Sequence, residues 1–425
     1  METKYSGILL KSFEGESMKN KGKKKRETWI KFRHKVITAI GRPIVAPFTR
    51  WKFGVNIEPF AQEGSRQYLV LLNHQTTFDQ FFVAIAFKNP IYYMATEDIF
   101  SMGWISTLLR WAIAPIPIKK QTTDLQAVMN CMKVLKEGGN IAIAVEGNRT
   151  YSGKTEHINP AIVKMVKRMK VPVALFRIEG GFGVQPRWSD VVRKGKMRAY
   201  VSEVIEPEQM AAMSEEELLR RICDGLYVDD PSAGGIFKHQ KSAEYMERAL
   251  YVCPDCGLSV FYSHDDMISC TKCGKKIRYQ EDMQLKGEGF AFPFKTVTEW
   301  YEYQKAFINQ LDLSLYEQDA LYQDKVKLSE VILYKNKQLM REEASVALYG
   351  NRIVVDEGKE GQLIWPFEEV TAVSVLGRNK LNVYHDKRVF QFKGDKRFNA
   401  LKYVNLYYRW KNIHTEGEDS GFLGI

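Results

Sequence analysis

The stretch that decides the fold is YLVLLNHQTTFDQFFVAIAF, residues 68–87. Its first five residues are an apolar run typical of a buried strand, and the run from Gln80 to Phe87 is apolar and helix-like. Thr76 and Thr77 are candidate helix N-caps, and Gln80 stands at capping-box spacing from Thr77. The stretch therefore predicts a strand, a short polar turn and a helix.

The polar turn contains His74 and Asp79, a possible general base and the carboxylate that would orient it. Residues at this spacing lie roughly 140° apart around an ideal helix, so the two side chains cannot meet inside one helix. They can meet if His74 lies in the loop and Asp79 lies in the first helical turn, where the helix dipole favours an ionised carboxylate. Such a carboxylate would fix the imidazole tautomer and support the imidazolium. The alternative is a helix-capping loop with a structural histidine.

Strands and helices alternate from about residue 66 to residue 205. Strands are expected at residues 68–72, 91–95, 141–145, 171–178 and 197–204, and helices at residues 80–87, 105–113, 123–137 and 161–169. This alternation predicts an α/β domain with a mostly parallel sheet. Polar residues follow several of the strands, as expected where such a sheet forms a site at its carboxyl edge.

Composition predicts a globular protein with two or three domains. The chain has 425 residues, of which 45% are hydrophobic and 27% are charged. It has no apolar run long enough for a transmembrane helix, and Ile8 to Leu10 is too short for the core of a signal peptide. We therefore expect a cytoplasmic protein.

The net charge of +11 is concentrated near the N-terminus. Between Lys19 and Lys35, nine basic residues stand against Glu27 alone, with aromatic and aliphatic residues among and after them. We predict a flexible basic arm at residues 1–27 and an amphipathic, membrane-associating helix at residues 28–52. Both would bind an anionic membrane surface, so the protein would be peripheral on the cytoplasmic face. A solvated arm and a phosphate-binding tail for nucleic acid are the alternatives.

Two Cys-x2-Cys pairs are formed by Cys253, Cys256, Cys270 and Cys273, and a glycine follows each pair. Two such pairs joined by a short β-rich insert can place four thiolates tetrahedrally around Zn²⁺. Residues 251–280 therefore resemble a zinc ribbon. Because four cysteines leave no open coordination position, we predict a structural zinc. A redox role for either pair is the alternative.

The sequence pattern changes at about residue 326. Seven short alternating runs, separated by turn signals, are followed by an amphipathic helix at residues 398–410. Many small strands closed by one helix resemble a pleckstrin-homology (PH) or GRAM-like barrel, at residues 326–425. A helical linker is expected at residues 281–325.

The polar blocks of the α/β region together resemble the phospholipid/glycerol acyltransferase family, which includes the lysophosphatidic acid acyltransferases. The matching residues are Asn73, His74 and Asp79 in the first block, Ile118 to Lys120 in the second, Glu146, Gly147 and Arg149 in the third, and Val171-Pro172 in the fourth. Lys120 stands where the family has arginine, which keeps the charge but loses the bidentate fork. Val145 and Asn148 stand where the family has proline and threonine. The resemblance covers about residues 50–205 and implies an acyltransferase domain at residues 53–250.

The resemblance implies transfer of a fatty acyl group from acyl-CoA or acyl carrier protein to a hydroxyl of a lysophospholipid, most simply 1-acyl-glycerol-3-phosphate. His74 would be the general base and Asp79 would orient it, and the reaction would need no catalytic cofactor. The residues that would shape the acceptor site or bind its phosphate are Lys120, Glu146, Gly147 and Arg149.

Two other functions fit parts of the chain. A non-catalytic lipid-binding scaffold would use the basic arm and the C-terminal domain, but it would not need His74 and Asp79. A nucleic-acid-binding protein would use the arm and the ribbon. Acidic residues such as Asp255 and Asp265 offset the lysines of the ribbon, so we do not expect nucleic acid as a partner.

Overall fold

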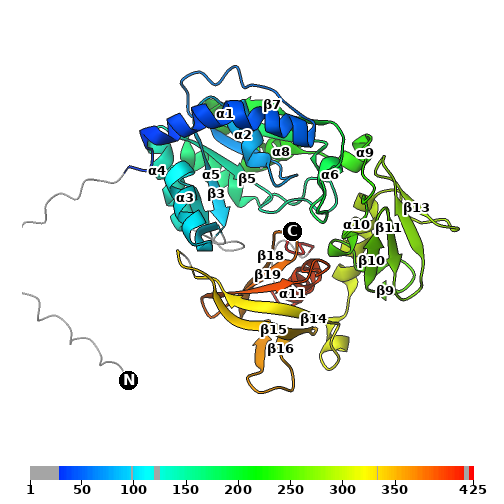
Figure 1. Cartoon of the computed structure of the whole chain (residues 1–425). Helices are drawn as coiled ribbons and strands as arrows, with labels where there is room; N and C mark the ends of the chain where they lie inside the picture. The colour runs from blue at the N-terminus through cyan, green and yellow to red at the C-terminus, as the bar shows by residue number, and fades with distance from the viewer. Residues whose placement is uncertain (1–27, 97–98, 119–124, 333, 416–420) are drawn as a thin grey trace, which may run out of the picture.

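The structure is a computed structural model that describes residues 28–96, 99–118, 125–332, 334–415 and 421–425. The predicted basic arm and Lys120 lie outside these described residues. The described chain has an N-terminal α/β part, a small β part that carries the cysteine pairs, and a C-terminal β part (Figure 1). Among the described helices, none has the length and hydropathy that a membrane crossing needs.

A mixed sheet of seven strands forms the centre of the α/β part. The strands are β1 (Val55–Ile57), β2 (Leu69–Leu72), β3 (Ile91–Thr96), β4 (Ile116–Ile118), β5 (Asn140–Ala144), β6 (Val173–Glu179) and β7 (Met197–Ile205). Their order in the sheet is β1-β7-β6-β2-β5-β3-β4, and every neighbouring pair is parallel except β6 and β7. The predicted mostly parallel sheet is thus confirmed.

Helices cover both faces of this sheet, which is why its central strand is apolar throughout. The helices are α1 (Phe32–Phe53), α2 (Asp79–Ala86), α3 (Trp104–Ile113), α4 (Leu125–Lys136), α5 (Ala161–Met169), α6 (Gly181–Val184), α7 (Pro207–Ala212), α8 (Glu215–Leu226) and α9 (Asp230–Ala233). Val70 and Leu72 of β2 belong to one buried cluster with residues of α2, whereas Leu69 and Leu71 belong to another with residues of α4, α5 and α8. A side chain on either face of β2 is therefore buried.

The cysteine-bearing part has six short strands. They are β8 (Val252–Cys253), β9 (Gly257–Leu258), β10 (Phe261–His264), β11 (Met267–Cys270), β12 (Lys276–Tyr279) and β13 (Leu285–Gly287). Strands β8 and β9 pair with each other, and β10 to β13 form an antiparallel sheet in chain order. The two pairs of cysteines lie at strand ends, so two tight turns face each other.

The C-terminal part is a curled antiparallel sheet of seven strands with one closing helix. The elements are β14 (Tyr322–Glu330), β15 (Gln338–Leu348), β16 (Arg352–Val355), β17 (Leu363–Pro366), β18 (Val370–Leu376), β19 (Lys380–His385), β20 (Arg388–Gly394) and α11 (Leu401–His414). The strand order is β17-β16-β15-β14-β20-β19-β18. The predicted seven strands and closing helix are confirmed, since all seven strands lie in this sheet and α11 buries Tyr403, Leu406 and Tyr407.

A single cluster of buried apolar side chains joins the three parts. It runs from Phe82 in the α/β part through Phe261 in the cysteine-bearing part to Val383 in the C-terminal part. Helix α10 (Val297–Gln310), which lies in the expected linker region, contributes the fully buried Trp300 to it. The three parts therefore share a core.

Candidate active site

The loop after β2 brings His74 and Asp79 into contact. His74 Nδ1 lies 2.8 Å from Asp79 Oδ2. Asp79 is the first residue of α2, and His74 precedes the helix in the loop, as the helix geometry predicted. The Asp79 side chain is 1% exposed, whereas that of His74 is 26% exposed, so the imidazole can be reached from solvent.

Asp79 also closes the turn that precedes its helix, and the start of that helix differs from the predicted one. Its carboxylate accepts hydrogen bonds from the backbone N–H of Gln75 at 2.7 Å and of Thr76 at 2.9 Å, and from the Thr76 hydroxyl at 2.6 Å. The residue at the N-cap position is Phe78, which makes no side-chain cap bond. The expectation that Thr76 or Thr77 caps α2 is wrong, because the helix begins only at Asp79. The Thr76 hydroxyl accepts from the Phe78 N–H inside the turn, and the Thr77 hydroxyl donates to Gln185.

The carboxylate of Glu146, at the end of β5, holds the His74 loop from the other side. Its Oε1 accepts from the His74 backbone N–H at 2.6 Å, and its Oε2 accepts from the Glu156 backbone N–H at 2.7 Å. Gly147 follows with a φ of +66°, a backbone conformation that residues with a side chain rarely adopt. The described contacts of Glu146 are therefore those of a residue that positions the His74 backbone.

Burial sets the protonation state of the site. Burial lowers the pKa of His74, whereas the hydrogen bond to Asp79 and the charge of Asp79 raise it. The charges of Arg149 and Arg187 lower this pKa further. The imidazole is therefore neutral near pH 7. Because Nδ1 faces a carboxylate, we assign the proton to Nδ1, which leaves the lone pair of Nε2 for a substrate. Burial also raises the pKa of Glu146 well above its usual range.

Two buried arginines lie close enough to His74 for their charges to act on its imidazole. Arg149 is 7% exposed, and its Nη1 has no hydrogen-bond partner among the described residues. Arg187, which the sequence did not single out, donates from Nη1 to the Arg149 backbone oxygen at 2.8 Å. It also lies over the Tyr151 ring at 4.4 Å. The site thus combines a neutral base with buried positive charge.

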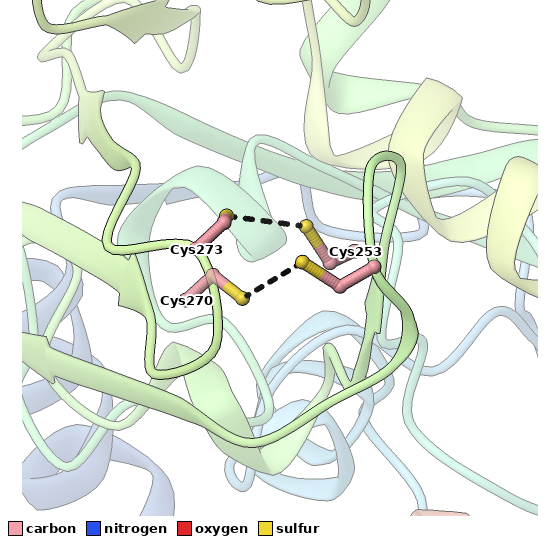
Figure 2. A group of neighbouring side chains, drawn as sticks. Cys253, Cys270 and Cys273 are labelled. Atoms are coloured by element: carbon pink, nitrogen blue, oxygen red, sulfur yellow. Dashed lines mark hydrogen bonds between the residues drawn. The ribbon is translucent and has the colours of Figure 1, made fainter.

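The four cysteines of the cysteine-bearing part lie close together. Figure 2 shows the sulfur atoms of the labelled cysteines directed toward one another. All four Sγ atoms lie within 4.8 Å of one another. The Cys253–Cys273 and Cys256–Cys270 sulfur distances are 3.9 and 4.0 Å. Tetrahedral Zn–S bonds of about 2.3 Å place sulfurs roughly 3.8 Å apart. The cluster could therefore hold a metal ion of that size.

Comparisons with known proteins agree with this geometry for one segment. Residues 54–178 match the family described as Acyltransferase, a span that contains His74, Asp79, Glu146 and Arg149. No curated protein matches the chain.

Two solved structures show weaker likeness. The 1-acyl-sn-glycerophosphate (LPA) acyltransferase PlsC from Thermotoga maritima is 21% identical, with a TM-score of 0.38, over 45% of this chain and 75% of that one. The N-terminal PH domain of human ARAP2 is 21% identical, with a TM-score of 0.18, over 23% of this chain and 85% of that one.

Proposed function

We propose that the protein moves a fatty acyl group from an acyl thioester to a glycerolipid hydroxyl, because residues 54–178 match the acyltransferase family. The donor is acyl-CoA or acyl carrier protein, and the acceptor is a lysophospholipid, 1-acyl-glycerol-3-phosphate first of all. The observation that carries the proposal is the His74–Asp79 contact, with the imidazole neutral and open to solvent.

In the proposed reaction, His74 Nε2 takes the proton of the acceptor hydroxyl, while Asp79 stabilises the imidazolium. The hydroxyl oxygen attacks the thioester carbonyl carbon, and an ester C–O bond forms as the C–S bond breaks. The thiolate leaves and takes the proton from the imidazolium. The acyl group passes directly between substrates, so the step uses no covalent enzyme intermediate.

A donor and acceptor panel tests this proposal. Purified protein is incubated with acyl-CoA or acyl carrier protein and with glycerol 3-phosphate, lysophosphatidate or other lysolipids. Mass spectrometry then records the products. We expect an acylated glycerolipid with lysophosphatidate, at a rate that depends on protein concentration. No ester product from any donor and acceptor pair would sink the proposal.

Helix α1 supports membrane-surface binding by the same protein. One side of the helix, which lies along the outside of the α/β part (Figure 1), exposes an apolar row about one turn apart: Phe32, Val36, Ile40, Ile44, Phe48 and Trp51. The adjacent helix α3 exposes Trp104 and Trp111, and Arg33 of α1 donates to the Trp111 backbone oxygen at 2.8 Å. An exposed apolar surface beside basic residues suits an anionic bilayer. The ring centroids of Phe48 and Phe78 are 6.2 Å apart, so the apolar row extends to the loop that contains His74.

Vesicle binding tests the membrane proposal. Ile44 and Trp51 are 66% and 81% exposed, so their replacement by serine should leave folding unchanged and weaken co-sedimentation with anionic phosphatidylglycerol vesicles at least several-fold. A matched variant with serine at Val260 and Leu315, also exposed but elsewhere, should bind as the parent does. Equal binding by all three proteins would remove α1 from the membrane surface.

The cysteine cluster supports a structural zinc site. Four thiolates within 4.8 Å of one another would complete the coordination of Zn²⁺ and leave no position for a substrate. Bound zinc would hold the β8–β9 turn against the β11–β12 turn. The strand order and closing helix of the C-terminal part support, in the same way, a PH-like barrel.

A further inference from the structure

The C-terminal part reaches the candidate active site through the turn between β18 and β19. Arg187 donates from Nη2 to the Asn148 side-chain oxygen at 3.2 Å, and the same Nη2 lies 3.5 Å from the backbone oxygen of Val375, in β18. Arg378 lies in the turn that follows, beyond the segment that matches the acyltransferase family. Positive charge therefore approaches the site from two parts of the chain.

Carboxylates balance these charges only in part, because the charge of Asp79 acts on Arg149 without forming a salt bridge to it. Asp190 Oδ1 lies 2.7 Å from Arg248 and 3.3 Å from Arg378, so one carboxylate serves two guanidinium groups. Arg149 and Arg187 have no salt bridge among the described residues. Glu146 directs both carboxylate oxygens to backbone N–H groups. A surplus of buried positive charge is costly unless an anion joins it.

Such an anion could accept hydrogen bonds from guanidinium N–H groups that have no other partner. Arg149 Nη1, Arg187 Nε and Arg378 Nε are all buried and have no hydrogen-bond partner among the described residues. Burial, and then the charges of Arg187 and Arg378, lower the pKa of Arg149 to about 9. The guanidinium groups of Arg187 and Arg378 are thus both close enough to Arg149 for their charges to act on it.

We propose that Arg378 of the C-terminal part joins Arg149 and Arg187 in a subsite for a phosphate monoester, beside His74. This proposal rests on the proposed function and deepens it, because it assigns substrate recognition to the C-terminal part. A phosphate monoester offers the double negative charge and the several acceptor oxygens that three guanidinium groups can share. The monoester could be the acceptor headgroup of lysophosphatidate or the 3′-phosphate of coenzyme A.

Steady-state kinetics of the full chain with Arg378→Gln test the proposal. We expect KM for the phosphate-bearing substrate to rise on the order of 10- to 100-fold, as for loss of a charged hydrogen bond, while kcat changes little. Arg378→Lys should restore part of the loss because it keeps the charge. Arg388→Gln, which removes an exposed salt bridge to Glu330 in the same sheet, should leave both constants unchanged.

The substrate that is affected identifies the source of the phosphate. A rise in KM for lysophosphatidate alone assigns the subsite to the acceptor, and a rise for acyl-CoA alone assigns it to the donor. A monoacylglycerol acceptor, which lacks phosphate, should respond to Arg378→Gln less than lysophosphatidate does. Unchanged KM for both phosphate-bearing substrates would overturn the proposal, and so would an equal loss with monoacylglycerol, since a merely structural role predicts it.

Calorimetric titration with glycerol 3-phosphate and with coenzyme A separates this proposal from the acyltransferase function. The parent should bind the ligand that carries the recognised phosphate, and Arg378→Gln should bind that ligand at least tenfold more weakly with an unchanged melting temperature. Such binding without any acyl transfer would support the subsite and reject the proposed reaction. Acyl transfer with equal binding of both ligands by parent and variant would reject the subsite alone.

Discussion

Replacing His74 with alanine is expected to lower kcat for acyl transfer by about 10²- to 10⁴-fold, the usual contribution of a positioned general base. The side chain is partly exposed and its partner Asp79 keeps three other hydrogen bonds, so the fold should persist. The measurement is single-turnover transfer from a labelled acyl thioester, with circular dichroism to check folding. His264 is an exposed histidine of the cysteine-bearing part, so His264→Ala is the matched control and should transfer the acyl group at the parent rate. Acyl transfer by His74→Ala at nearly the parent rate would exclude His74 as the general base.

The pH dependence of the parent gives an independent check on the same residue. A base is active when deprotonated, so kcat/KM should fall as the pH drops through the pKa of His74. Burial holds that pKa below the ordinary histidine value of about 6.5, so the acid limb should lie below this pH. An acid limb centred above pH 7 would point to a different base.

Replacing Cys273 with serine is expected to remove the metal and destabilise the whole chain. Structural zinc contributes roughly 10–16 kcal/mol of apparent binding free energy in small peptides, whereas a whole domain is stable by only about 5–15 kcal/mol. Because Cys253 and Cys270 lie in the core that the three parts share, loss of the metal should not remain local. We expect one zinc per chain in the parent by elemental analysis, and a strongly lowered melting temperature or insolubility in the variant.

The control and a second measurement make this result interpretable. Cys223→Ser replaces a thiol outside the cluster and should keep both metal and stability. If Cys273→Ser cannot be purified, a thiol reagent added to the parent should release zinc as it blocks the cluster. A parent without zinc, or a Cys273→Ser variant with parental zinc and stability, would reject the structural site.

The strands of the α/β part could be predicted because a parallel strand buried on both faces is a continuous apolar run. Strands β1 and β4 have only three residues each, which is too short for a periodic pattern, and neither was predicted. The strand order also could not be read from the sequence. The pairing of β1 with β7, for example, joins Val55 to Met197, and local patterns contain no information on such distant contacts.

Helix geometry predicted where His74 and Asp79 must lie for their side chains to meet, and the structure has them there. The N-cap could not be predicted in this way, because the turn extends to Phe78 and α2 begins only at Asp79. The Thr76 hydroxyl accepts from the Phe78 N–H inside the turn instead. Arg187 was not found because a single arginine outside a motif is most often a surface charge. Its burial depends on residues such as Val375, which is distant in sequence.

The core that joins the three parts has a consequence for the interpretation of natural sequence variants. Trp300 and Val383 lie more than one hundred residues beyond the segment that matches the acyltransferase family. They nevertheless belong to the same buried cluster as Phe82, in the helix that follows the His74 loop. Replacing any of these three residues with a smaller one creates a cavity in one shared interior. The severity of a variant is therefore better judged from its burial in this interior than from its distance along the chain from His74.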